Sequence, residues 1–328
     1  IFQEMLKNNP NNFLLSPLSA EIALAFAQSG CKGETAREIR TALSLPDNSE
    51  KVESAVKDVL SNLTANEFYA LHTANKMYVK ANFAIKDEFK RAAVEVYQAD
   101  SENIDFTKNV EAAKTMNQWV EKRTDNKIRD LVDSGDLDEL TRVVLINALH
   151  FKANWSTPFL RQSTRKRKFY KTSKDVVEID TMNEYGGRYK YFECPHLNAK
   201  LLELPFEGGE ASMTIILPNE KEGLAAIENQ IEKAFVPHDL TTKLVNVALP
   251  KFKIGNRVDF KQILKNLGVH SAFDEKKADL SGIAGDKGDL KINEVKQKTF
   301  MEVNEDGVEA AAATYVGLWL MLECSILY

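Results

Sequence analysis

An apolar run at residues 143–151 constrains the fold of this 328-residue chain more than any other segment. It reads Val-Val-Leu-Ile-Asn-Ala-Leu-His-Phe, without the polar alternation of a strand that has one face in water. This pattern predicts a strand that is covered on both faces. Asn147 lies in its middle, and a buried amide has to be hydrogen-bonded. We therefore expect Asn147 to belong to a polar cluster inside the protein.

Helix and strand patterns alternate along the whole chain, without a linker or an internal repeat. A buried helix is expected after Ser16, because Ser caps helices and Pro17 fits a first turn. Apolar spacing predicts a long amphipathic helix at residues 108–131. Further helices are expected at residues 87–97 and 260–267, and strands at residues 71–79, 201–206, 212–217 and 244–249. The sequence thus predicts one domain of mixed helix and strand.

Charge and motif content exclude several classes of protein. Lys and Arg number 43 against 48 Asp and Glu, a net charge of −5, whereas nucleic-acid binders draw affinity from excess cations. No apolar stretch is long enough for a membrane helix. The sequence contains no H-E-x-x-H, G-x-S-x-G or phosphate-loop motif, and its cysteines show no zinc spacing. We therefore expect no enzyme, metal or cofactor, and no nucleic-acid or membrane partner; the cysteines are Cys31, Cys194 and Cys324.

Three minor features leave alternatives open. The basic run at residues 165–168, Arg-Lys-Arg-Lys, fits a solvated strand or turn, and alternatively a site for sulfated polysaccharide. Asn62, within Asn-Leu-Thr, is a glycosylation site only if the chain is secreted. One disulfide is arithmetically possible. Residues 1–6 read as part of an amphipathic helix, so the natural chain is expected to begin earlier.

The segment at residues 303–316 admits two readings. Its four consecutive alanines favour a helix. Read at a period of two, however, one face carries small or β-branched side chains throughout, namely Val308, Ala310, Ala312, Thr314 and Val316. Such a face would enter a packed interior with little steric resistance, whereas a charged or bulky residue there would stall the entry. The second reading is a segment with two locations, an exposed loop and a strand inside a sheet.

Several motifs, in order, resemble the serpin family over essentially the whole chain, with an insect character. The matching segments are residues 12–19 (Asn-Phe-Leu-Leu-Ser-Pro-Leu-Ser), 30–35, 147–155, 202–206 and 249–252, with Phe159, Thr164 and Phe169. The resemblance implies an α+β fold with three β-sheets, about eight or nine helices and a C-terminal reactive centre loop. It implies a single serpin domain at residues 1–328, with the hinge and reactive loop at residues 305–328.

The resemblance also implies a function, inhibition of serine-type endopeptidases by a suicide mechanism. The loop acts as bait, and after cleavage it inserts into the main sheet and distorts the attached protease. The alternative is a non-inhibitory serpin, a carrier or chaperone. Kinship further implies a secreted, extracellular monomer whose partner is a serine protease.

Family positions carry over to named residues. The hinge would be Glu305, Gly307, Val308, Glu309, Ala310, Ala311, Ala312 and Ala313. Counting from Gly307 puts the reactive bond at Met321–Leu322, within a window that also includes Leu320, Glu323 and Cys324. Apolar residues there imply a chymotrypsin-like or elastase-like target, and cleavage after Glu323 would instead imply acidic specificity.

Two polar clusters are implied in the main sheet. The breach would bring Lys251 and Glu305 together beside Trp155. The shutter would contain Ser16, Ser19, Asn147 and Gln297. Gln297 replaces the family's usual histidine, and an amide can still donate and accept hydrogen bonds. A locking role is therefore expected, without a pH-sensing one.

The family's closing strands would follow the reactive loop, and they and the extreme N-terminus are not in this sequence. We expect the strands to be a separate C-terminal peptide produced by proteolysis, with the loop then inserted, or to have been left out for another reason.

Overall fold

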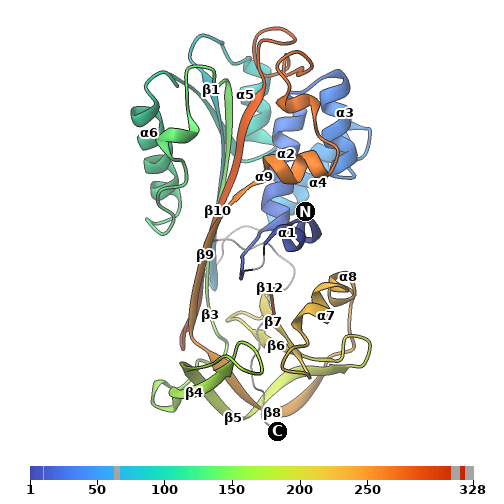
Figure 1. Ribbon diagram of the computed structural model, residues 1–328, viewed down its shortest axis with the longest axis vertical. Coiled ribbons are helices and arrows are strands. Elements are labelled where there is room, and N and C mark those ends of the chain that lie inside the picture. The colour runs from blue at the N-terminus through green and yellow to red at the C-terminus, as the bar shows by residue number, and fades with distance from the viewer. Residues whose placement is uncertain (10, 63–66, 312–317, 322–328) are drawn as a thin grey trace.

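The computed structural model describes residues 1–9, 11–62, 67–311 and 318–321, and shows an elongated molecule built around one long sheet (Figure 1). These residues contain nine α-helices: α1 Phe2–Asn8, α2 Pro17–Ser29, α3 Gly33–Ala42, α4 Ser49–Asn62, α5 Asp87–Glu95, α6 Asn109–Arg123, α7 Leu224–Glu228, α8 Ile231–Ala234 and α9 Phe260–Asn266. The strands are β1 Tyr69–Lys80, β2 Ala99–Ile104, β3 Val143–Asn154, β4 Arg165–Tyr170, β5 Val176–Cys194, β6 Ala199–Pro205, β7 Ser212–Pro218, β8 Thr241–Pro250, β9 Phe252–Asp259, β10 Ile292–Val303, β11 Gly307–Ala311 and β12 Leu318–Met321.

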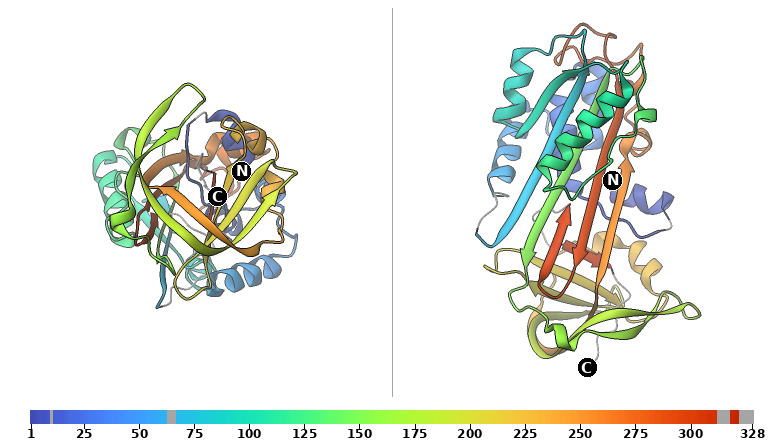
Figure 2. Two further views of the ribbon diagram at one scale, coloured as in Figure 1. Left: turned by 90° about the horizontal axis from the view of Figure 1, so that it is seen from below. Right: turned by 90° about the vertical axis from the view of Figure 1, so that its left-hand side faces the viewer.

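The long sheet has the strand order β2-β1-β3-β11-β10-β9. Along its upper half, as drawn in Figure 1, β3 and β10 pair directly and in parallel, Val143 to Ala148 of β3 with Ile292 to Lys298 of β10. We call this boundary the seam. Below the seam the short strand β11 lies between β3 and β10 and pairs with both in antiparallel fashion (Figure 2, right). The two central strands of the sheet are therefore joined at one end and parted at the other.

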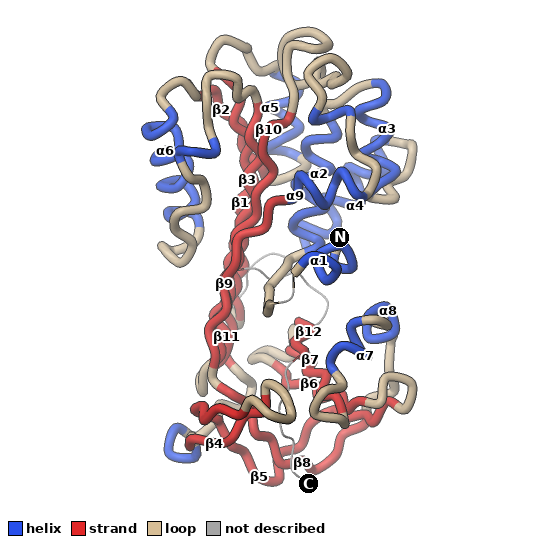
Figure 3. The backbone as a smooth tube through the Cα atoms, viewed as in Figure 1, coloured by secondary structure: helices blue, strands red, loops and turns tan. Residues whose placement is uncertain are grey.

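The remaining strands form two further sheets joined by the long strand β5. Its first part pairs with β4 and β8, and its last part pairs with β6, which continues to β7 and β12. These strands gather at the opposite end of the molecule from most helices (Figure 3). The expected α+β class, three sheets and eight or nine helices are thus confirmed within the described part of the chain.

Helices cover both faces of the long sheet, as the apolar run requires. Val143 and Leu145 point into a core shared with α2, while Val144 and Ile146 point into a second core shared with α6. All four are fully buried. The prediction of a strand covered on both faces is confirmed, and α2 begins at Pro17 as expected. Among the helices described here, none is both long and apolar enough to cross a membrane.

One predicted helix is too long. The pattern at residues 108–131 predicts a single helix, but α6 ends at Arg123. Asp125 and Asn126 then adopt left-handed φ angles of 48° and 59°, which Asp and Asn tolerate better than most residues and which cannot continue a right-handed helix. The apolar residues that follow, Ile128, Leu131 and Val132, pack onto the sheet as an irregular segment instead.

Candidate functional site: the hinge, the breach and the shutter

The hinge enters the long sheet as β11. Its register places Gly307 opposite Asn154 of β3 and Val308 between Ala153 of β3 and Val303 of β10. A Cβ atom at Gly307 would lie 2.1 Å from the carbonyl oxygen of Ala153. No side chain fits that spacing, so the close approach of β11 to β3 requires glycine at this position.

The two faces of the hinge differ as the period-two reading predicts. Val308 is 2% exposed and packs in an apolar cluster with Ala153, Met301 and Val303. Glu309, on the other face, forms an ion pair of 3.0 Å with Lys127, which follows α6. The backbone of Ala310 and Ala311 continues β11. Ala312 and Ala313 lie outside the described residues. Because β3 pairs directly with β10 along the seam, the loop is not fully inserted in this structure, and the expectation of a cleaved chain with its loop inserted is not met.

The breach residues lie together at the lower end of the sheet, where β11 begins. The Glu305 carboxylate, which is 3% exposed, accepts hydrogen bonds from Lys251 Nζ at 2.7 Å and from Thr164 Oγ1 at 2.7 Å. Burial alone would raise the pKa of Glu305, but the hydrogen bonds from Lys251 and Thr164 outweigh it and lower that pKa. Glu305 is therefore a buried, ionised anchor at the base of the hinge.

Trp155 holds the other side of this turn. Its indole Nε1 donates to the carbonyl oxygen of Asn304 at 2.9 Å, and its ring stacks on Phe206 at 4.9 Å between centroids. The backbone N–H groups of Trp155 and Phe159 donate to the carbonyl oxygens of Asp306 and Glu305. The turn that leads into β11 is thus fastened by backbone and side-chain bonds to the segment after β3.

The shutter residues form one buried hydrogen-bond network across the seam. Gln297 Nε2 on β10 donates to Asn147 Oδ1 on β3 at 2.6 Å and to the Ser16 carbonyl oxygen at 3.2 Å. Asn147 Nδ2 donates to Ser19 Oγ at 2.6 Å and to Asn75 Oδ1 at 2.5 Å. All five residues are at most 3% exposed. The network joins β10, β3, β1 and the start of α2, and it closes the seam on its inner face.

The sequence reasoning missed Asn75. Its signal was present, since a polar residue stands within the strand pattern at residues 71–79, but only the register of β1 against β3 sets Asn75 beside Asn147. Asn304 and Arg161 were also missed; Arg161 forms an ion pair with Asp306 beside the hinge.

The window for the reactive bond is described only in part. Leu320 and Met321 belong to β12, which pairs in parallel with β7, Leu320 opposite Ile215. Leu322, Glu323 and Cys324 lie outside the described residues.

Other candidate groups are engaged in the fold. Cys31 and Cys194 are buried free thiols, and burial raises the pKa of Cys31 to about 12. In the basic run, Arg167 donates to Asn183 and Lys166 pairs with Asp180. In the part of the chain that the structure describes, no group of three or more His, Cys, Asp or Glu residues is arranged to hold a metal ion.

Comparisons with known proteins agree with this geometry. The family described as "Serpin (serine protease inhibitor)" matches residues 1–325. Alaserpin of Manduca sexta is 36% identical over 328 residues, covering 97% of this chain and 82% of its own length. Human leukocyte elastase inhibitor is 36% identical over 326 residues, covering 96% of this chain and 85% of its own. The crystal structure of Serpin48 from the insect Tenebrio molitor has a TM-score of 0.91 and 56% identity, covering 98% of this chain and 88% of its own.

Proposed function

This chain belongs to the serpin family, and we propose that it is a suicide inhibitor of serine-type endopeptidases. Serpins are protease inhibitors and not enzymes, so the catalytic nucleophile is the target's. The observation that carries the proposal is the position of β11, a short strand held between β3 and β10 at the open end of the sheet. A hinge already in register can extend as a strand once its far end is released.

The proposed reaction begins with attack by the target's serine on the carbonyl carbon of the residue before the reactive bond. The peptide bond breaks, the new amino terminus leaves, and the serine oxygen becomes an acyl ester of the inhibitor. The released loop then extends β11 along the seam and parts β3 from β10. The ester-linked protease moves with it and is distorted before water can hydrolyse the ester.

We propose Met321–Leu322 as the reactive bond, within the window from Leu320 to Cys324. Its apolar residues, Leu318 to Leu322 in sequence, suit the apolar primary pocket of a chymotrypsin-like or elastase-like protease. The name of the relative leukocyte elastase inhibitor supports this choice. Cleavage after Glu323 would indicate an acidic specificity instead.

We further propose that the protein is secreted and acts outside the cell as a monomer. A separate C-terminal peptide would accompany a cleaved chain. If the protein is secreted, glycosylation at Asn62 and polysaccharide binding at residues 165–168 can both be measured on the purified protein.

The test is incubation with chymotrypsin, elastase and a subtilisin-like protease, followed by electrophoresis after boiling in detergent. A complex that survives boiling, with release of a peptide whose mass begins at Leu322, is the expected result. Cleavage without a complex by every protease of this panel would contradict inhibition and favour the alternative, a non-inhibitory carrier or chaperone. A peptide that begins elsewhere would move the bond and leave the inhibitory function standing.

A further inference from the structure

The irregular segment between α6 and β3, residues 129–137, lies over the seam on the outer face of the long sheet. We call it the flap. It is anchored on the β1 and β3 side: Asn117 of α6 exchanges two hydrogen bonds of 2.9 Å with the backbone of Val132. Leu131 and Leu137 are buried in the same core as Val144 and Ile146. The flap is therefore carried by the half of the sheet to which β3 belongs.

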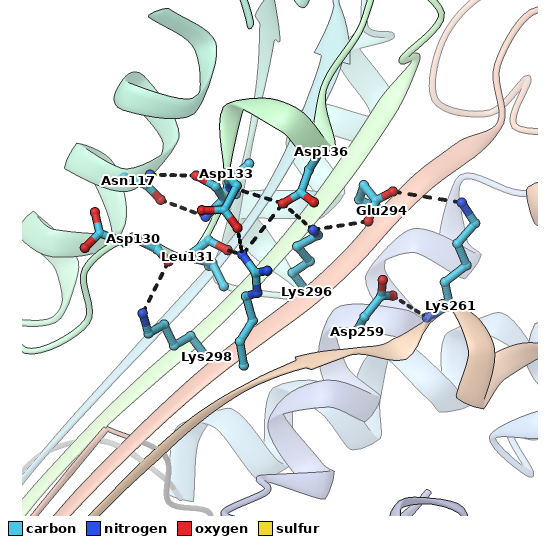
Figure 4. Close-up of polar contacts among 12 residues, drawn as sticks. Asn117, Asp130, Leu131, Asp133, Asp136, Asp259, Lys261, Glu294, Lys296 and Lys298 are labelled. Carbon is cyan, nitrogen blue, oxygen red and sulfur yellow. Dashed lines mark hydrogen bonds and ion pairs between the residues drawn. The ribbon is translucent and has the colours of Figure 1, made fainter. Parts of the chain in front are cut away.

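The charged groups of the flap reach across the seam to the other half (Figure 4). Asp136 pairs with Lys296 of β10 at 2.5 Å, and Asp133 pairs with Arg257 of β9 at 2.5 Å. Lys298 of β10 donates to the carbonyl oxygen of Arg129 at 2.6 Å. These contacts join the flap to β9 and β10, the strands that must move away from β3 when a new strand enters.

Lys296 is the deepest of these groups. Its side chain is 4% exposed, and its register partner on β3 is Ile146, so it stands on the closed seam itself. Its second partner, Glu294 at 3.4 Å, lies on its own strand. Of the two partners of this buried ammonium, Asp136 is the one that lies on the β3 side of the seam. A buried cation that loses a partner is strongly destabilised.

Insertion of one strand moves β10 away from β3 by about one strand spacing, roughly 4.8 Å. That exceeds the range of these ion pairs, and the anchored flap cannot follow β10. We propose that the flap is an electrostatic latch across the seam, which sets the rate at which β11 extends past Lys298. This inference rests on the proposed function, because a rate of insertion exists only if the loop inserts.

The experiment compares wild type with Asp136→Asn and Arg257→Gln in the full-length protein. The asparagine keeps an acceptor for the backbone N–H of Asp133, which Asp136 binds in the structure, and removes the charge that faces Lys296. Lys190→Gln is the matched control, because Lys190 pairs with Glu203 at 2.9 Å between β5 and β6, away from the seam. Each protein is nicked in the reactive loop, and the appearance of a heat-resistant form is followed in time.

We expect insertion to be faster by about tenfold in Asp136→Asn, which leaves the buried ammonium with Glu294 alone. Arg257→Gln, at a more exposed pair, should speed insertion by about two- to fivefold, and the control should insert at the wild-type rate. High salt should speed insertion in wild type and reduce the difference in insertion rate between wild type and Arg257→Gln. Equal rates in wild type and both variants would overturn the latch alone. The absence of a heat-resistant form in every protein, wild type included, would overturn the proposed function as well.

Discussion

The two halves of the boundary between β3 and β10 differ in what fills it. In the lower half β11 occupies the space, with Gly307 pressed against β3 and Val308 buried between the strands. In the upper half the strands pair directly, and polar groups fasten them on both faces: Gln297 and Asn147 on the α2 face, Lys296 and Asp136 on the α6 face. Apolar cores cover both faces of the sheet at the seam, whereas beside β11 the apolar core lies on one face, and Lys152 and Asn154 are exposed on the other. The two halves therefore differ both in apolar cover and in the polar groups that join the strands.

The largest effect is expected from a charge in the lower half, which β11 occupies. Val308→Asp would bury a carboxylate without a partner among Ala153, Met301 and Val303, at a cost of several kcal/mol, about 3–5. We expect loss of the hinge strand and at least about a hundredfold loss of inhibition, since about 1.4 kcal/mol corresponds to tenfold. The measurement is the amount of detergent-stable complex formed per cleavage. Val110→Asp, at a valine that is 66% exposed on α6, is the control and should behave as wild type.

A smaller effect is expected from weakening the seam, in the upper half. Gln297→Met removes the donor to Asn147 Oδ1 and Ser16 O and leaves those buried acceptors without this bond. Each lost bond costs about 1–3 kcal/mol, so the free energy of unfolding of the uncleaved protein, measured in urea, should fall by about 2–6 kcal/mol. Gln262→Met, on the exposed face of α9, should change it by less than about 0.5 kcal/mol. An unchanged midpoint for Gln297→Met would show that the shutter does not fasten the seam.

At the breach, where the hinge enters the sheet, the stability of the fold should depend on pH. The pKa of Glu305 is lowered, so its pairing stabilises the fold above the ordinary value of 4.5 and is lost as pH falls through the lowered pKa. Wild type should therefore lose stability in acid more steeply than Glu305→Gln, and the two stabilities should converge once the pH is below the lowered pKa. Thermal melts across this range measure it. Parallel curves for the two proteins would contradict an ionised, paired Glu305.

The smallest effect is expected at the indole of the breach. Trp155→Phe keeps the ring against Phe206 and removes the hydrogen bond to Asn304. The loss should be about 1 kcal/mol of unfolding free energy. Trp119→Phe on α6 gives a comparison at a second tryptophan outside the breach. A loss of several kcal/mol would mean that packing, and not the hydrogen bond, carries the role of Trp155.

The sequence predicted β3 well because its run of apolar residues has one physical explanation. It did not predict β10, although that strand is equally central. Lys296, Gln297 and Thr299 are each at most 3% exposed, yet their polarity breaks the pattern by which a buried strand is recognised. Their burial is tolerated only because partners from other elements satisfy them, and those partners are fixed by the fold.

The residues of the candidate site were likewise predicted only in part. The family resemblance suggested the residues of the shutter and breach, and the structure brings each cluster together. Asp133 and Asp136 carried no such signal, because a carboxylate in a polar segment reads as an exposed residue. Their partners, Arg257 and Lys296, are more than a hundred residues away in sequence. Contacts of that kind follow from topology, and local pattern does not contain them.

Because Gly307 has no side chain, this position tests directly whether β11 can pair with β3. The space beside Ala153 admits a hydrogen atom and refuses a methyl group. Any substitution at this position would therefore disturb β11 in the uncleaved protein, before a protease binds. A library of all substitutions at this codon, selected for trapping, should return the parent residue alone.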